Sequence, residues 1–433
     1  MSRRRPGTTI HDRASVLAGT SRGRALLGVP IALAAVAALA AAAGGSPLKS
    51  GPGTVTTRTA FSAQSRQASP SSPSRAGQRA LSLPATPLVT GSWKLLPRTP
   101  VTKAPDQAMT VWTGKKMIIY GIRHTASGTF FRRFNVAYRP GTDAWQQLPR
   151  GPRPVNNGQG GNVGAWTGSE MLVLGPTAGA YNPATSTWRR VSPDGPGPTD
   201  GAVTGWTGRQ VLVWGGVCCA PSNSGRAYDV ATNAWTAMPA APLAPRAFPA
   251  GAWTGRELVV AGGSVRNSDG TVKVFRNGAA YNPATSTWRR LPFMPRPRYG
   301  AQAVWDGKEV LFLGGFRAPG TAPATRGMAY NPATSTWRRL PAMRFGRDRF
   351  AAVWTGRRVL VWGGVSGRNG TALPPHGEAY NPATSTWTAL PMAPLHGRAS
   401  PVAVWTGHQM IVWGGYFGST AYTDGAAFTP RRP

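Results

Sequence analysis

Short apolar runs alternate with glycine-rich and polar turns throughout residues 92–430. Runs such as Val211–Trp214 and Val359–Trp362 follow a Thr-Gly turn and end at a pair of glycines. Runs of this length between turn residues predict short strands rather than amphipathic helices. The composition agrees, because the chain has 17 Trp and 55 Gly and only 15% charged residues. The pattern therefore predicts an all-β fold.

The same unit recurs seven times, and such self-similarity indicates a repeat architecture. Each unit opens with Trp-Thr-Gly or Trp-Asp-Gly and continues into an apolar strand that ends, in most copies, at a Gly pair. An Ala-aromatic pair and a closing Trp follow. The opening residues are Trp112, Trp166, Trp206, Trp253, Trp305, Trp354 and Trp405. The aromatic residues are Tyr138, Tyr181, Tyr228, Tyr281, Tyr330, Tyr380 and Phe428.

The intervals inside the unit predict its hairpins. The opening Trp stands ten residues before the second Gly in the five copies that keep the pair, and the aromatic residue stands seven before the closing Trp in all six complete copies. The interval from the Gly pair to the aromatic residue varies from twelve to eighteen residues. We therefore expect four antiparallel strands, a to d, with short a–b and c–d turns at one end and variable b–c and d–a loops at the other. These are called the turn end and the loop end below, and we expect function at the loop end.

The ends of the repeat region predict how the ring closes. The last unit stops after its strand c at Phe428, whereas an orphan strand d with Trp93, at residues 92–97, precedes the first unit. An open ring would leave two bare sheet edges, so residues 92–97 are expected to complete the seventh sheet.

These residues resemble the Kelch-repeat β-propeller family, within the galactose oxidase-like central domain superfamily. The shared marks are the double Gly that ends strand b, the aromatic residue a dozen or more positions later, and the Trp seven beyond it. The first two units depart from the pattern, with Ile122 and Pro176 in place of the second Gly. The resemblance covers residues 92–430 and implies a seven-bladed Kelch-type β-propeller. It does not select a function, since Kelch propellers include both enzymes and binding platforms.

The region before the repeats predicts export. Residues 1–24 are basic, residues 25–45 are uncharged and mostly Ala, and cations before an apolar run mark the cytoplasmic end of a signal peptide or a transmembrane anchor. Residues 46–91 are rich in Ser, Pro and Arg and poor in large apolar side chains, so they predict a disordered linker. We expect the propeller outside the cytoplasmic membrane, anchored to it or secreted.

The charge bears on partners rather than on the fold. Lys and Arg total 49 against 14 Asp and Glu, which gives a formal charge of +35. A summed positive potential attracts polyanions, so an anionic ligand, an envelope polymer or an acidic protein segment is the expected partner, with no specific nucleic acid and a monomeric chain. The alternative is a compositional bias toward Arg without functional meaning.

Four arginines of the d–a loops each stand seven residues before the opening Trp of their unit, in units 4 to 7. Arg offers a planar, bidentate fork for carboxylate or phosphate, so these residues predict a ligand-binding arc at the channel mouth. The alternative is that each Arg braces the propeller through a neighbouring carbonyl or acid. The candidate ligand-binding residues are Arg246, Arg298, Arg347 and Arg398, with Asp106, Asp200 and Gln159 in units 1 to 3. The Trp-Arg-Arg segments of strand d are expected to form a solvated basic rim.

Cys218 and Cys219, in the b–c loop of unit 3, are the only cysteines. In an oxidising compartment they are expected to form a vicinal disulfide. Free thiols, metal capture and an intermolecular bridge are the alternatives.

Metal and cofactor chemistry is not expected. Weak candidates for metal ligands are the loop residues His124, His376, His396 and Tyr416. Copper radical oxidases of the galactose oxidase type use a Kelch-like propeller, but they need a Cys bonded to a ligand Tyr, and here both cysteines lie in another unit. No G-x-S-x-G, P-loop or H-E-x-x-H motif occurs.

Two hypotheses follow. The first is an extracytoplasmic binding or scaffold module that recognises an anionic ligand through its b–c and d–a loops. The second is an extracytoplasmic carbohydrate-active or oxidising enzyme at the same channel mouth, for which loop acids such as Asp348 and Glu378 are candidate acid–base groups.

Overall fold

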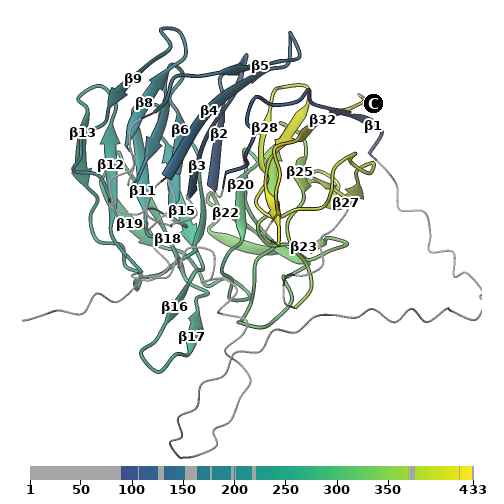
Figure 1. Cartoon of the computed structure of the whole chain (residues 1–433). Coiled ribbons are helices and arrows are strands. Elements are labelled where there is room, and N and C mark those ends of the chain that lie inside the picture. The colour runs from purple at the N-terminus through teal and green to yellow at the C-terminus, as the bar shows by residue number, and fades with distance from the viewer. Residues whose placement is uncertain are drawn as a thin grey trace, which may run out of the picture.

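A computed structural model describes residues 89–105, 107–124, 131–151, 163–175, 178–196, 199, 201–216, 221–368, 370, 376–418 and 420–431. Within these ranges every regular element is a β-strand. Seven four-stranded antiparallel sheets are arranged around a common axis as a seven-bladed β-propeller (Figure 1). The predicted all-β, seven-bladed fold is confirmed.

Each blade runs from strand a inside to strand d outside. Blade 1 is β2 (Gln107–Trp112), β3 (Met117–His124), β4 (Phe131–Arg139) and β5 (Ala144–Gln147). Blade 2 is β6 (Val163–Trp166), β7 (Met171–Leu174), β8 (Gly179–Asn182) and β9 (Thr187–Arg190). Blade 3 is β10 (Val203–Trp206), β11 (Gln210–Trp214), β12 (Gly225–Asp229) and β13 (Ala234–Ala237). Blade 4 is β14 (Ala250–Trp253), β15 (Leu258–Ala261), β18 (Gly278–Asn282) and β19 (Thr287–Arg290).

Blades 5 to 7 follow the same plan. Blade 5 is β20 (Gln302–Trp305), β21 (Val310–Leu313), β22 (Arg326–Asn331) and β23 (Thr336–Ala342). Blade 6 is β24 (Ala351–Trp354), β25 (Val359–Trp362), β26 (Glu378–Asn381) and β27 (Thr386–Ala389). Blade 7 is β28 (Val402–Trp405), β29 (Met410–Trp413), β32 (Gly425–Pro430) and β1 (Gly91–Leu95).

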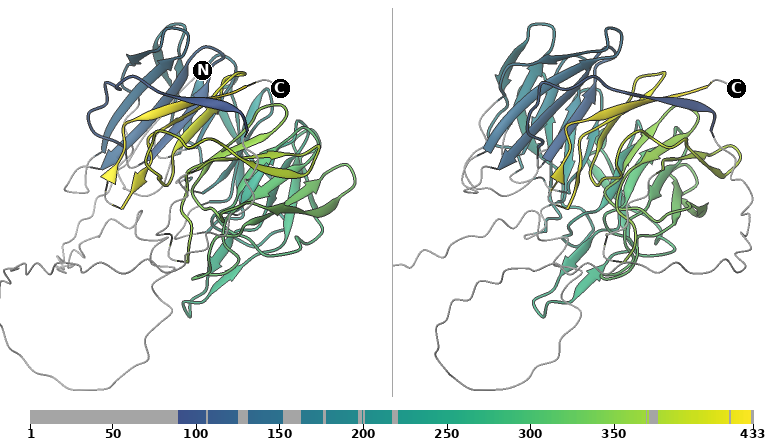
Figure 2. Two further views of the ribbon diagram at one scale, coloured as in Figure 1. Left: turned by 90° about the vertical axis from the view of Figure 1, so that its right-hand side faces the viewer. Right: turned by 45° about the vertical axis from the view of Figure 1, so that its right-hand side comes forward.

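The N-terminal strand closes the ring, as predicted. β1 pairs antiparallel with β32, and Trp93 lies opposite Phe428, so the two ends of the propeller share blade 7 (Figure 2). The Trp93 ring packs on Phe428, and its indole N–H donates to the Pro391 carbonyl of blade 6. β1 therefore supplies the strand d that the last repeat lacks, and blade 7 becomes a complete four-stranded sheet.

The turn end is regular because most blades repeat similar turn chemistry. In the a–b turn of blade 2, the Thr167 hydroxyl accepts the Glu170 N–H, and Gly168 has a positive φ of 99°. In its c–d turn, the Asn182 side chain accepts the Ala184 N–H, and Ser186 has a φ of 57°. Side-chain oxygens that cap turns in this way fix the loop length, which explains the constant intervals in the sequence.

The hydrophobic core lies between neighbouring blades. Strands b are buried along their length, as in β7, β15 and β21. One typical cluster joins Leu212 and Trp214 of blade 3 to Leu258 and Val260 of blade 4. Because each apolar strand packs on both sides against adjacent blades, it can be apolar at every position.

Two small hairpins extend the loop end. β16 (Ser264–Arg266) pairs with β17 (Val272–Val274) in the b–c loop of blade 4 and projects from the body (Figure 1). β30 (Tyr416–Phe417) pairs with β31 (Thr420–Ala421) in blade 7. In the part of the chain that the structure describes, no helix is long and apolar enough to cross a membrane. The predicted signal or anchor at residues 25–45 and the linker lie outside it and stay predictions.

Candidate functional site

The four loop arginines predicted as a binding arc occupy equivalent places, but their side chains are buried. Their exposed fractions are 0% to 3%. In every case Nη1 donates to the carbonyl of the first Gly of the same blade, sixteen residues along the chain. The four pairs are Arg246–Gly262, Arg298–Gly314, Arg347–Gly363 and Arg398–Gly414.

The same arginines also join one blade to the next. The N–H of the second Gly donates to the carbonyl of the Arg in the following blade, as from Gly263 to Arg298 at 2.7 Å and from Gly364 to Arg398 at 2.8 Å. Gly262 has a φ of 72°, and a Cβ there would collide with the Arg298 carbonyl, so the close approach requires glycine.

Two of the four guanidiniums have a carboxylate partner. Arg347 contacts Glu378 at 3.0 Å, with both side chains almost fully buried, whereas Arg398 contacts Asp424 at 2.6 Å near the surface. Arg246 and Arg298 rely on carbonyl and amide oxygens, and burial lowers the pKa of both to about 10. Both stay charged at neutral pH.

This geometry matches the bracing role that the sequence left open as the alternative. The ligand-binding role of the four arginines stays a prediction. The other three predicted ligand-binding residues, Asp106, Asp200 and Gln159, lie outside the described residues, as do Cys218 and Cys219.

A second set of equivalent loop positions was not predicted from the sequence. It lies two residues after each of these arginines. Phe248, Gly300, Arg349 and Ser400 all have a positive φ between 51° and 65°. They are joined across blades, because Gly300 N–H donates to the Phe248 carbonyl and Ser400 N–H donates to the Arg349 carbonyl. The constant offset of two residues from each loop arginine could have indicated these positions.

Arg349 belongs to a polar cluster at the loop end of blades 5 to 7. Its Nε contacts Asp348 at 3.1 Å, and its Nη1 donates to the Tyr416 hydroxyl at 2.7 Å. Burial raises the pKa of Asp348 to about 6, although Arg349 opposes the shift. Burial, with a smaller effect of Asp348, raises the pKa of Tyr299 to about 12. The cluster can therefore change its charge in mildly acidic solution.

The loops of blades 4 to 6 carry a group of exposed cations. Eight arginine and lysine side chains there are exposed and form no ion pair with a described carboxylate. Of the three acids in these loops, Asp348 and Glu378 are buried and Asp269 alone is exposed. The eight, called the loop-end basic patch, are Arg266, Lys273, Arg276, Arg296, Arg317, Arg326, Arg344 and Arg368.

The weak metal candidates have other contacts. The backbone carbonyl of His376 accepts from Arg347, and the His396 ring stacks on Tyr422. Tyr416 binds Arg349, and the side chain of His124 is outside the described part. Among the described side chains, no group of three His, Cys, Asp or Glu could hold a metal ion.

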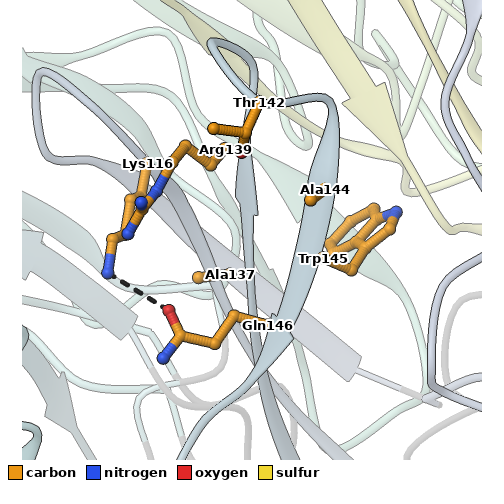
Figure 3. A pocket seen from close by; sticks show the side chains of 7 residues that line it. All are labelled: Lys116, Ala137, Arg139, Thr142, Ala144, Trp145 and Gln146. Atoms are coloured by element: carbon orange, nitrogen blue, oxygen red, sulfur yellow. Dashed lines mark hydrogen bonds between the residues drawn. The ribbon is translucent and has the colours of Figure 1, made fainter.

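The turn end of blade 1 has a shallow depression (Figure 3). Lys116, Arg139, Thr142 and Gln146 are among the residues that line it, and Lys116 Nζ donates to the Gln146 side-chain oxygen at 3.2 Å. The Trp145 ring points away from the Lys116–Gln146 pair.

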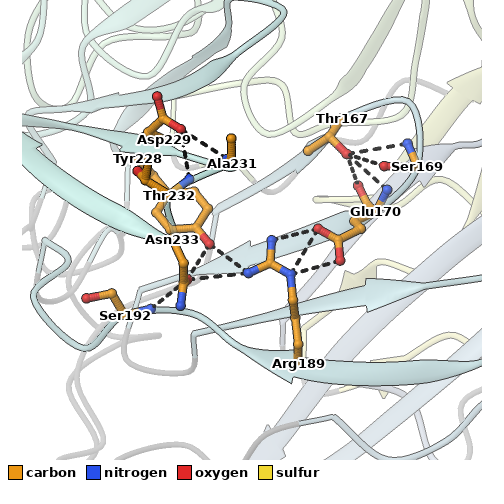
Figure 4. A network of polar contacts seen from close by, with 10 residues as sticks. All are labelled: Thr167, Ser169, Glu170, Arg189, Ser192, Tyr228, Asp229, Ala231, Thr232 and Asn233. Carbon is orange, nitrogen blue, oxygen red and sulfur yellow. Dashed lines mark hydrogen bonds and ion pairs between the residues drawn. The ribbon is translucent and has the colours of Figure 1, made fainter.

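At the equivalent place in blade 2, an Arg contacts a Glu of its own blade and a Tyr of the next blade (Figure 4). We call this Arg–Glu–Tyr contact an inter-blade latch. Arg189 pairs with Glu170 of its own blade at 2.7 Å and donates to the Tyr228 hydroxyl of blade 3 at 2.9 Å. Blades 4 and 5 repeat the latch with Arg289–Glu257–Tyr330 and Arg338–Glu309–Tyr380. The predicted solvated rim is thus correct for the second Arg of each Trp-Arg-Arg segment, which is exposed, and wrong for the first.

Comparisons with known proteins add little to this geometry. No protein-family model and no curated protein matches the chain. Among solved structures, the chain is similar to "Structure of YjhT", with 17% identity and a TM-score of 0.42 over 55% of this chain and 96% of that chain. The seven four-stranded sheets of the described residues define the class as a seven-bladed β-propeller.

Proposed function

We propose that this propeller is a non-enzymatic binding module that holds an anionic partner on its b–c and d–a loops. The proposal includes the Kelch type of the repeat, which rests on the Gly pair, the aromatic residue and the closing Trp. It also keeps an extracytoplasmic location, which rests on residues 1–45.

The loop-end basic patch is the observation that carries the proposal. The patch has eight exposed cations against one exposed acid. Exposed charges of one sign raise the local concentration of the opposite charge and favour association at low salt. The Arg276 guanidinium lies 5.1 Å from the ring centroid of Phe293, which is 64% exposed, so the patch also offers apolar contact area.

The buried arginines support this role indirectly. They tie the first Gly carbonyl of each b–c loop to the d–a loop of the same blade. Loops fixed in this way present their exposed side chains at low entropic cost, which favours binding. The proposal thus assigns positioning to the buried arginines and contact to the exposed ones.

The test compares two variants with the same loss of charge. The loop variant is Lys273→Gln, Arg276→Gln and Arg317→Gln, and the control is Arg190→Gln, Arg290→Gln and Arg339→Gln on the outer strands d, where all three residues are exposed. With heparin as the soluble polyanion, we expect the loop variant to bind about tenfold more weakly and the control to change by roughly twofold or less. The readout is Kd as a function of salt concentration.

Equal losses in the two variants would contradict the proposal, because they would show that heparin senses only net charge. A Kd that does not depend on salt would contradict it as well.

A further inference from the structure

The depression on blade 1 lies at the position where blades 2, 4 and 5 have an inter-blade latch. Lys116 directly precedes strand b, where blades 2, 4 and 5 have Glu170, Glu257 and Glu309. Gln146 follows the strand d Trp, where those blades have Arg189, Arg289 and Arg338. Blade 1 therefore has a cation where the other three blades have the carboxylate, and a neutral amide where they have the arginine.

A second cation stands at the same place. Arg139 follows the Tyr of the c–d turn, where blades 2, 4 and 5 have an Asn that caps the turn. Burial and the charge of Arg139 lower the pKa of Lys116. The two cations therefore repel one another, and an anion between them would remove that repulsion.

The nearby carboxylate is already bound elsewhere. Asp143 accepts Lys94 Nζ at 2.6 Å and the Tyr138 hydroxyl at 2.6 Å. The contact with Lys94 joins blade 7 to blade 1. The described residues that line the depression include no Asp or Glu. The site thus has donors without an acidic partner from the chain.

We propose that this depression binds an oxyanion, the carboxylate or phosphate group of a small ligand, between Lys116 and Arg139. Three other blades hold a carboxylate at the equivalent position, which indicates the chemistry that the fold accommodates there. Lys116 supplies a point charge and Arg139 a planar fork, and Thr142 and Gln146 add a hydroxyl and an amide donor. The site lies at the turn end, so it is independent of the loop-end basic patch.

The first experiment measures binding to the full chain by isothermal titration at low ionic strength. The probes are inorganic phosphate, glucuronate for a sugar acid, and N-acetylglutamate amide for a protein carboxylate. We expect Lys116→Gln to weaken the bound probe by roughly ten- to a hundredfold, the effect of one charge-assisted hydrogen bond. Lys115→Gln removes the same charge from an exposed neighbour in the same turn, and we expect at most about a twofold change.

The second experiment fills the site with a latch. The double variant Lys116→Glu with Gln146→Arg copies the pair of blade 2, so it should abolish probe binding and raise Tm by about 2 °C, because a partly exposed ion pair and a Tyr181 contact are gained. A gain in Tm also shows that the variant folds. Saturable binding that survives in the double variant, equal losses in Lys115→Gln and Lys116→Gln, or no saturable binding of any probe would each overturn the proposal.

Discussion

The two ends of the propeller use arginine for different purposes. At the loop end, the Arg246, Arg298, Arg347 and Arg398 guanidiniums are at most 3% exposed and donate mainly to backbone carbonyls of their own blade. At the turn end, the latch arginines have side chains that are 34% to 39% exposed and pair with carboxylates. The degree of burial determines how much each arginine contributes to the free energy of unfolding. A buried cation is costly to leave unpaired, whereas a partly exposed ion pair contributes little.

The comparison also explains where free positive charge remains. At the turn end, Glu170, Glu257 and Glu309 neutralise one Arg per latch. In the loops of blades 4 to 6, two of the three acids are buried, so the exposed cations of the loop-end basic patch are not paired with them. A large polyanion is therefore expected at the loop end, whereas the turn end offers the single site between Lys116 and Arg139, in a blade that lacks the Glu of the latch.

The largest effect is expected from Arg347→Met at the loop end. The substitution leaves the Glu378 carboxylate, 3% exposed, without its cation and removes the donor to the Gly363 carbonyl. Breaking a buried pair from one side costs about 3–5 kcal/mol, measured as the free energy of unfolding in urea.

Arg344→Met is the matched control, because Arg344 is exposed in the same loop. We expect a cost below about 0.5 kcal/mol for it. Adding Glu378→Gln to Arg347→Met should restore part of the loss, since the unpaired charge disappears. Similar costs for Arg344→Met and Arg347→Met would show that the buried arginine does not brace the loop.

The next effect depends on pH and concerns Asp348. Its pKa is raised from 3.8 to about 6 by burial, so the folded state binds its proton more tightly than the unfolded state does. The carboxyl therefore lowers the free energy of unfolding as pH rises from about 4 to 6. Asp348→Asn should be more stable than the wild type above pH 6 by up to about 3 kcal/mol, with no difference below pH 4. Unfolding curves at pH 3.5, 5 and 7.5 measure this, and a constant difference between the two proteins would contradict it.

Much of the architecture could be predicted from the sequence, because the turns have constant length. Thr167, Asn182 and their equivalents cap the turns with side chains, so the spacing of Trp, Gly and Tyr records the hairpins directly. The missing strand d of blade 7 and the orphan strand at Trp93 likewise implied the observed pairing with Phe428.

The arginine chemistry was harder to predict, because spacing locates a residue but not the direction of its side chain. Arg298 and Arg317 both lie in loops of the same end, yet Arg298 is buried and Arg317 is exposed. In Trp-Arg-Arg the alternation of a strand sends neighbouring residues to opposite faces. The occurrence of Glu before strand b in the same blades that carry this Arg was the overlooked signal.

A smaller effect is expected from Arg289→Gln at the turn end. It removes the contacts to Glu257 and to the Tyr330 hydroxyl of the next blade. Because the pair is partly exposed, the cost should be about 1 kcal/mol, several times less than for Arg347→Met. Arg290→Gln, the exposed neighbour, serves as control, and a cost as large as that of Arg347→Met would erase the distinction between the two ends.

The smallest effect is a gain, from building a latch between blades 3 and 4 with Gln210→Glu and Thr236→Arg. These residues occupy the positions of Glu170 and Arg189, and the Tyr281 hydroxyl of blade 4 is the acceptor that the new Arg should reach. The expected gain is about 0.5–1 kcal/mol.

The boundary between blades 6 and 7 provides the control, because Phe428 stands where the other blades have a Tyr and offers no hydroxyl. Arg358→Glu with Thr388→Arg therefore creates the ion pair without the inter-blade hydrogen bond. A larger gain in Tm for the variant beside Tyr281 than for the variant beside Phe428 would show that the turn-end arginines act between blades. Equal gains would instead show that the ion pair acts within its own blade, and the latch would then have no role in holding neighbouring blades together.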